Sequence, residues 1–314
     1  MGKAVQWRFC SRTTRKERIK QRKKVVLHDA GLSTQTQVRY YMGLRKVLPI
    51  VIGSNSMNEL DDNVADWVQD RWEKGDTLYQ VSDALCALHH YEPWMKGKIP
   101  RAWKLFGIWR RPESPNRAPP LVKSIVYAWA WYALHHQNMD FAAMILLGFF
   151  ALLRTGECLQ VTSKDLMLGE NTGIVSLHNT KTGKRNAARE MVQFDDYIAL
   201  EILREVVLFK KRAHLDCVPI WTRSAQSFRN QFAHHCSRFD MVKHGFRPYS
   251  MRRGGATALF QDTGSMESAL LKGRWQSTKV AKIYLADGLS HLPGLTFSPK
   301  AKKMLQQWDP VNQI

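Results

Sequence analysis

Four prolines within eleven residues, from Arg110 to Pro120, constrain the fold of this chain more than any other feature. Proline fixes φ and lacks a backbone N–H, so such a stretch can form neither a helix interior nor a central strand. We therefore expect residues 111–120 to be a linker. The chain has 314 residues, and domains usually have ~100–200, so a boundary here leaves one domain on each side.

The segment before the linker has the pattern of a small helical domain. Ser33 could cap a helix through Val47, and Pro49 with the polar cluster 53–56 should end it. The stretch at residues 92–109 is mixed and aromatic and indicates no element. Further helices are expected at Leu60–Arg71 and Leu78–Tyr91. We expect a helical domain at residues 29–110, preceded by a disordered basic arm at residues 1–28.

The segment after the linker is expected to be mainly helical with one small antiparallel sheet. A helical hairpin, Leu121–His135 and Met139–Leu153, should come first. Three strands follow, and Asp195 should cap a helix through Lys211. The strands are expected at Thr162–Leu168, Gly173–Leu177 and Ala188–Phe194, and the later helices at Ser224–Val242, Met251–Asp262, Glu267–Lys272 and Ser277–Leu285. This gives an α+β domain at residues 121–290 and a C-terminal tail at residues 291–314.

The charge of the chain narrows the classes of partner. It has 47 Lys and Arg against 27 Asp and Glu, a formal net charge of +20 at pH 7. Ten basic side chains and one acidic one lie within residues 1–24, and the remaining chain is also basic. Such a surplus attracts a polyanion, either a nucleic acid or an acidic membrane surface. The run Lys16–Lys24 resembles a nuclear-localisation signal, although a solvated terminus explains it equally well.

Hydropathy and cysteine spacing bear on the compartment. The longest uncharged apolar run, Phe141–Leu153, has 13 residues, whereas a bilayer requires ~18–20, so we expect a buried helix and no membrane partner. No apolar run follows the basic N-terminus, which argues against a secretory signal. The five cysteines form no Cys-x-x-Cys pair, which favours a reduced protein. We expect a nuclear location in a eukaryotic host, or a cytoplasmic one otherwise.

Several common catalytic arrangements are missing from the sequence. It has no paired-carboxylate cluster, no His-Glu-x-x-His and no glycine-rich nucleotide loop. The histidine doublets at 89–90, 135–136 and 234–235 direct their side chains to different faces of a helix, so they are poor metal ligands. We therefore expect neither a metal site nor a cofactor.

The second domain does contain an ordered series of basic and aromatic residues. Arg154 follows a fully apolar helix, where burying an unpaired charge would cost several kcal/mol. Glu157, three residues later, could orient the Arg154 guanidinium from one helical turn away. Lys181 heads a Lys-Thr-Gly turn between two expected strands. The segment Tyr249–Thr257 opens a helix, whose N-terminus favours anions.

With Arg252, Trp275 and Tyr284, this series resembles the tyrosine recombinase (phage-integrase) superfamily. The family pattern is Arg with Glu or Asp, then Lys, His-x-x-Arg, His or Trp, and Tyr. The sequence of Tyr249–Thr257 is similar to that of Crypton- and DIRS-like recombinases of eukaryotic mobile elements. The resemblance covers about residues 29–290. It implies a helical core-binding domain and an α+β catalytic domain that together clamp double-stranded DNA.

The resemblance also implies roles for individual residues. Tyr284 would attack the scissile phosphorus without a metal and form a 3′-phosphotyrosine link during site-specific recombination or DNA integration. Arg154 and Arg252 would neutralise the non-bridging oxygens. The other implied roles are orientation of Arg154 by Glu157, general acid catalysis by Lys181, a hydrogen bond from Tyr249 to the scissile phosphate, and an indole N–H or packing contribution from Trp275.

One departure from the family pattern leaves alternatives open. Tyr249 stands where the family usually has histidine, and a phenol with an ordinary pKa of ~10 accepts a proton less readily. A catalytically retired DNA-binding protein and a type IB topoisomerase-like enzyme are therefore further possibilities. An active recombinase would work as a homotetramer on DNA. Its C-terminal tail would pass to a neighbouring copy or pack onto its own domain.

Overall fold

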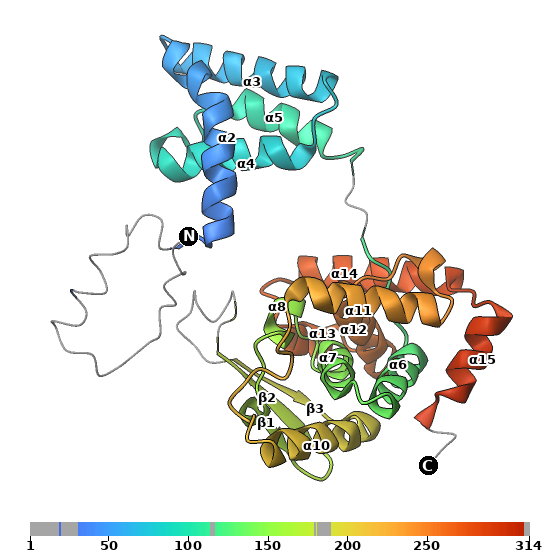
Figure 1. Cartoon of the computed structure of the whole chain (residues 1–314). Coiled ribbons are helices and arrows are strands. Elements are labelled where there is room, and N and C mark those ends of the chain that lie inside the picture. The colour runs from blue at the N-terminus through green and yellow to red at the C-terminus, as the bar shows by residue number, and fades with distance from the viewer. Residues whose placement is uncertain (1–18, 20–30, 114–116, 179, 181–189, 311–314) are drawn as a thin grey trace. The chain divides into compact units, whose positions relative to one another are not determined.

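The structure is a computed structural model that describes residues 19, 31–113, 117–178, 180 and 190–310 (Figure 1). The chain divides into two compact units, Met1–Asn116 and Arg117–Ile314. Almost all of the predicted basic arm lies outside the described residues, and so does Lys181.

The first unit is a bundle of helices packed in two pairs (Figure 1). Its helices are α2 (Thr34–Gly53), α3 (Met57–Glu73), α4 (Leu78–Tyr91) and α5 (Pro100–Trp109). Helix α2 packs against α4, and α3 packs against α5, around a shared apolar core. Gly43 brings the first pair close together, because a Cβ there would lie 2.8 Å from the backbone nitrogen of Ala84.

The first unit corrects two details of the sequence prediction. The Ser33 cap is confirmed, since its hydroxyl accepts from the Thr36 N–H. The expectation that Pro49 ends the helix is wrong, because α2 continues through it to Gly53. Pro49 is exposed, so water can solvate the carbonyl that loses its hydrogen bond. Helix α5 occupies the aromatic stretch for which no element was expected.

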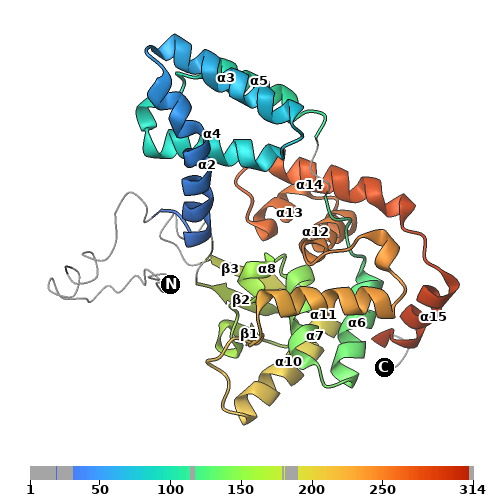
Figure 2. The same cartoon turned by 45° about the horizontal axis from the view of Figure 1, so that its top comes forward.

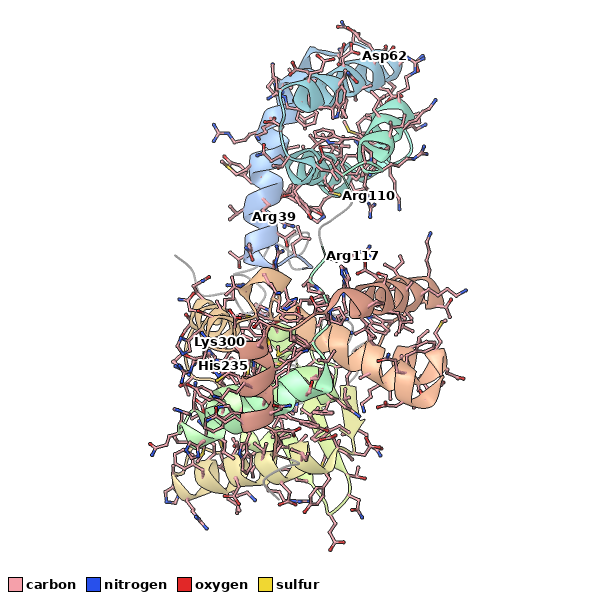
Figure 3. The ribbon with its side chains drawn as sticks, turned by 90° about the vertical axis from the view of Figure 1, so that its right-hand side faces the viewer. Arg39, Asp62, Arg110, Arg117, His235 and Lys300 are labelled. Atoms are coloured by element: carbon pink, nitrogen blue, oxygen red, sulfur yellow. The ribbon has the colours of Figure 1, made fainter. Side chains whose placement is uncertain are left out.

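Ion pairs connect the surfaces of these helices. Arg39 on α2 reaches Asp83 on α4 at 3.5 Å, and Asp62 on α3 pairs with Arg101 on α5; Arg39 and Asp62 are labelled in Figure 3. More than half of the Arg39 and Arg101 side chains is exposed. Exposed pairs of this kind contribute ~0–1 kcal/mol, so apolar packing is the main source of stability of the bundle.

The second unit is mainly helical and is built around α12 (Figure 2). Its helices are α6 (Lys123–His135), α7 (Met139–Phe150), α8 (Thr155–Cys158), α10 (Tyr197–Arg212), α11 (Ala225–Arg238), α12 (Tyr249–Thr263), α13 (Met266–Gly273), α14 (Thr278–His291) and α15 (Pro299–Gln307). Helix α12 packs against α6, α7, α13 and α14. Every residue of α7 from Phe141 to Phe150 is buried, which confirms the expected core helix, although it ends at Phe150 and not at Leu153 as predicted. No helix in the described part of the chain is long and apolar enough to span a membrane.

The sheet has three antiparallel strands in the order β1-β2-β3, namely β1 (Leu166–Leu168), β2 (Gly173–Leu177) and β3 (Glu190–Phe194). The first strand is shorter than predicted. Residues 163–165 form a 3₁₀ turn, because Asp165 accepts hydrogen bonds from the backbone and hydroxyl of Thr162. The following helix is capped by Asp196 rather than by Asp195. The predicted fold class, mainly α with a small antiparallel sheet, is confirmed.

Two adjacent glycines allow α12 to lie at the centre of this unit. A Cβ at Gly254 would overlap the carbonyl oxygen of Leu121 and lie 2.8 Å from its nitrogen and carbonyl carbon. A Cβ at Gly255 would overlap the carbonyl oxygen of Phe149, near the end of α7. Any larger residue would therefore displace the helix that carries Arg252.

The C-terminal tail packs onto its own domain in the structure. Ala301 on α15 is fully buried, and α15 contacts α6. The Trp308 ring meets the Tyr132 ring edge-on, with 5.0 Å between centroids, and also contacts the His136 ring. The tail was expected either to pass to a neighbouring copy or to pack onto its own domain, and in this single chain it packs onto its own domain.

Candidate active site

Helix α12 places Arg252 in the interior of the second unit. The residue is 1 % exposed, and its two terminal nitrogens donate to the backbone carbonyls of Leu152 and Gly273. Burial, reinforced by the positive charges of Arg154 and Arg274, lowers the pKa of Arg252 to about 10. The guanidinium therefore remains charged at neutral pH, in surroundings where a further negative charge would be stabilising.

Helix α14 carries Tyr284 to the N-terminal end of α12. Ser277 caps α14 by accepting from the Val280 N–H. The Tyr284 ring stacks on the Trp275 indole with 4.8 Å between centroids and 28° between planes. Its hydroxyl forms a hydrogen bond with the hydroxyl of Tyr249, the first residue of α12. The Arg252 guanidinium carbon lies 5.4 Å from the Trp275 ring centroid, so these aromatic residues border the buried arginine.

The turn between α7 and α8 supplies Arg154, and α8 supplies Glu157. Glu157 accepts from the Arg154 side chain at 2.6 Å and from the Arg154 backbone N–H at 2.8 Å. Leu152, in the same turn, has a φ of 48°, a left-handed conformation that is strained for a branched residue. Its carbonyl accepts from Arg252. Arg154 keeps 32 % of its side chain exposed, whereas Glu157 keeps 8 %, so the guanidinium is accessible and the carboxylate that holds it is buried.

Arg274 is a member of this cluster to which sequence reasoning assigned no role. Its Nη2 donates to Glu157 at 2.7 Å, and its Nη1 donates to Glu190 at 3.0 Å. Burial raises the pKa of Glu157, but the hydrogen bonds and charges of Arg274 and Arg154 outweigh it and lower that pKa overall.

Arg253 is a second arginine that sequence reasoning left without a role. It pairs with Asp287 on α14, and its guanidinium carbon lies 5.6 Å from the Tyr284 ring centroid. The pair joins α12 to α14 next to Tyr284, so it fixes the position of the helix that carries the phenol.

Six of the seven residues predicted for the site are described, and contacts connect them in two groups. The first group consists of Tyr249, Arg252, Trp275 and Tyr284, and the second consists of Arg154 and Glu157. Leu152 and Arg274 join the groups. The Leu152 carbonyl accepts from Arg252 and, at 3.4 Å, from Arg274, which in turn donates to Glu157. The seventh residue, Lys181, lies outside the described residues. The part of the chain that is described contains no cluster of His, Cys, Asp or Glu that could hold a metal ion.

The fold is that of known DNA recombinases and integrases. The sequence matches no protein-family model and no curated protein. The Tn1549 transposon integrase in complex with circular intermediate DNA is similar in structure, with a TM-score of 0.57, 13 % identity and coverage of 92 % of this chain and 96 % of that one. XerH recombinase bound to palindromic difH substrate has a TM-score of 0.56 and 11 % identity, with coverage of 89 % of this chain and 82 % of that one. A lambda integrase dimer bound to a COC′ core site has a TM-score of 0.54 and 15 % identity, with coverage of 83 % of this chain and 92 % of that one.

This likeness extends over both units of the chain. The matched region of XerH covers 89 % of this chain, so it includes helices of the first unit as well as the α+β second unit. The chain therefore has the tyrosine recombinase fold, as its sequence predicted.

Proposed function

We propose that the protein is a site-specific recombinase that cleaves and rejoins double-stranded DNA through a 3′-phosphotyrosine intermediate at Tyr284. The observation that carries the proposal is the position of Tyr284. Its ring stacks on Trp275 at 4.8 Å, its hydroxyl meets Tyr249, and Trp275 in turn lies 5.4 Å from the Arg252 guanidinium. A nucleophile and a buried cation suited to a phosphate are thus neighbours. The net charge of +20 supports a DNA partner.

In the proposed step, the Tyr284 oxygen forms a bond to phosphorus, and the bond between phosphorus and the 5′ oxygen breaks. The phenol gives its proton to water, and the 5′ oxygen gains one from Lys181 or from water. Arg154 and Arg252 neutralise the non-bridging oxygens, and losing one such donor typically costs ~10²–10³ in rate. Rejoining reverses the step, with the 5′-hydroxyl of a second strand as nucleophile. The phosphodiester energy is kept in the tyrosine link.

Tyr249 would act as a hydrogen-bond donor in this scheme. Burial, followed by the hydrogen bond to Tyr284, raises the pKa of Tyr249 above that of an ordinary phenol. The phenol therefore stays protonated at neutral pH and can donate to the developing phenolate of Tyr284. A hydrogen bond to a charged group contributes ~1.5–3 kcal/mol, which corresponds to about 10–100-fold in rate. Tyr249→Phe should slow cleavage by this factor.

A suicide-substrate assay tests the proposal. Nicked duplexes drawn from the flanks of the coding locus are incubated with the protein, and covalent protein–DNA adducts are separated on a denaturing gel. We expect an adduct that persists in EDTA, disappears in Tyr284→Phe and is unchanged in Tyr197→Phe, which alters an exposed tyrosine of α10. An adduct of equal yield in Tyr284→Phe would overturn the assignment of the nucleophile.

A non-catalytic DNA-binding protein is the second candidate function. It is favoured by the bond between the Tyr249 and Tyr284 hydroxyls, which engages the proposed nucleophile within the protein. This candidate predicts salt-sensitive binding to the same duplexes with no adduct, and an affinity that Tyr284→Phe leaves unchanged.

The finer parts of the proposal rest on the sequence. The similarity to Crypton- and DIRS-like elements depends on Tyr249–Thr257, and a nuclear location depends on Lys16–Lys24. We propose a core-binding domain at residues 29–110 and a catalytic domain at residues 121–290. A homotetramer on DNA is proposed from the resemblance to tyrosine recombinases.

A further inference from the structure

Arg274 makes more contacts to the site than its position in the sequence suggests. It is a buried guanidinium with 9 % of its side chain exposed. It donates to the carboxylates of Glu157 and Glu190, at 2.7 and 3.0 Å, and to the Leu152 carbonyl at 3.4 Å. These acceptors come from α8, from β3 and from the turn after α7, so one side chain joins three separate segments.

The backbone at Arg274 is an unusual place for a long side chain. Its φ of 53° and ψ of 43° form the left-handed C-cap of α13. Glycine occupies this conformation most easily, because a side chain at Cβ makes it unfavourable. The conformation turns the chain so that the guanidinium reaches the two carboxylates. A residue that only ended the helix would not need this side chain.

Two of the three acceptors of Arg274 also hold a proposed catalytic residue. Glu157 binds Arg274 through one oxygen and the Arg154 guanidinium through the other, at 2.7 and 2.6 Å. The Leu152 carbonyl also accepts from Arg252, whose other nitrogen donates to Gly273, the residue before Arg274. Glu190 begins β3 directly after residues 181–189, which include Lys181.

We propose that Arg274 is a positioning residue that holds the phosphate-binding arginines of the site in place. It acts on Arg154 through Glu157 and on Arg252 through the Leu152 carbonyl. The terminal nitrogens of Arg274 donate to two carboxylates that neutralise its charge, whereas those of Arg252 donate to neutral carbonyls, so we assign the phosphate to Arg252 and not to Arg274. The inference rests on the proposed function, because it assigns Arg154 and Arg252 to an oxyanion.

The charge balance explains why a third arginine is required. A buried Glu157 paired with Arg154 alone would draw that guanidinium inward and neutralise it. With Arg274 also bound, Glu157 is shared, and the two guanidinium groups of Arg154 and Arg274 pair with the two carboxylates of Glu157 and Glu190. Arg252, which donates to neutral carbonyls, adds a charge that no carboxylate neutralises. The Arg154 side chain, 32 % exposed, then retains donors for a ligand. The cluster as a whole keeps a positive charge that a phosphate can neutralise.

The test uses inorganic sulfate, a tetrahedral dianion with the shape of a phosphate, and the full chain. Sulfate dissociation constants are measured by isothermal titration calorimetry at physiological ionic strength. The variants are Arg274→Gln, Arg274→Lys, Glu157→Gln and the double variant Arg274→Gln with Glu157→Gln. Arg154→Gln defines the binding that belongs to the site. Arg204→Gln is the control, because Arg204 also bonds several acceptors but contacts none of the site residues.

We expect Arg274→Gln to weaken site-specific sulfate binding by about 10-fold, within the range of coupled neighbours. Arg274→Lys keeps the charge but cannot bridge both carboxylates, so its loss should be smaller. In the Glu157→Gln background, Arg274→Gln should add less than about 3-fold, because the route to Arg154 is already removed. Arg204→Gln should have no effect. Far-ultraviolet circular dichroism establishes that each variant is folded.

Several results would overturn the proposal. The first is an unchanged sulfate affinity in Arg274→Gln. The second is a loss of affinity on Arg274→Gln that is equal in the wild-type and Glu157→Gln backgrounds. The third is wild-type sulfate binding that Arg154→Gln does not weaken. If Arg274→Gln does not fold, the same criteria apply to Arg274→Lys. Sulfate binding does not require DNA cleavage. A protein that forms no DNA adduct can therefore still support the positioning role, and an active recombinase can still contradict it.

Discussion

Replacing Gly254 with alanine should destabilise the second unit more than its size suggests. The added Cβ would overlap the Leu121 carbonyl oxygen and lie 2.8 Å from the Leu121 nitrogen and carbonyl carbon, whereas real Cβ contacts are essentially never closer than 3.0 Å. All of these are backbone atoms, so no side chain can rotate away. Either α12 or the segment at Leu121 must shift, and the hydrogen bond from the Leu121 N–H to the Ser250 carbonyl, 3.0 Å long, is strained or lost.

The expected cost follows from these two effects. Overpacking costs ~1–3 kcal/mol, and a lost backbone hydrogen bond costs ~0.5–1.5 kcal/mol, so Gly254→Ala should lower the free energy of unfolding by about 2–4 kcal/mol. Urea denaturation followed by tryptophan fluorescence measures it. Gly156→Ala is the matched control in the same unit, since its Cβ would have no neighbour within 4 Å. Equal stability of the two variants would refute the close packing of α12.

Two further predictions concern α14 and the core. Ser277→Ala removes the cap of the helix that carries Tyr284 and should cost about 1 kcal/mol in urea denaturation; Ser277→Asp should restore it, and a neutral Ser277→Ala would contradict the cap. Burial lowers the pKa of His235 (labelled in Figure 3) from 6.5 to about 4, so the folded state favours the neutral imidazole. The free energy of unfolding should therefore be highest above pH 6.5 and should fall by about 3 kcal/mol at most as the pH is lowered toward 4. His235→Phe, which keeps the stacking on Phe141, should flatten this dependence, and an unchanged slope would argue against it.

The fold was predictable where local signals agree with packing. The run Phe141–Leu153 and the cap at Ser33 both indicate elements that the structure contains. Pro49 misled the prediction, because proline ends a helix only where the lost hydrogen bond cannot be replaced by water. Residues 163–165 were expected in a strand. They form a turn instead, because the Asp165 side chain competes with the sheet for the backbone of Thr162.

For the candidate site, the sequence predicted the pairing of Glu157 with Arg154 but not the other connections. The order from Arg154 to Tyr284 indicated which side chains to expect. Burial and backbone conformation decide how they are held, and neither has a short-range signal. Arg274 illustrates this, because its role depends on a left-handed backbone and on acceptors 84 and 117 residues away in the sequence. The contact between Tyr249 and Tyr284, 35 residues apart, likewise depends on the packing of α12 against α14.

The central claim is that Tyr284 is the nucleophile, and mapping the covalent adduct tests it most directly. The adduct formed with a nicked duplex is digested with nuclease and protease, and the nucleotide-bearing peptide is sequenced by mass spectrometry. Because the two hydroxyls share a hydrogen bond, Tyr249 is the natural competitor for the modification. We predict a nucleotide linked through its 3′ phosphate to Tyr284. A nucleotide on Tyr249, or no modified peptide in a protein that binds the same duplex, would contradict the account.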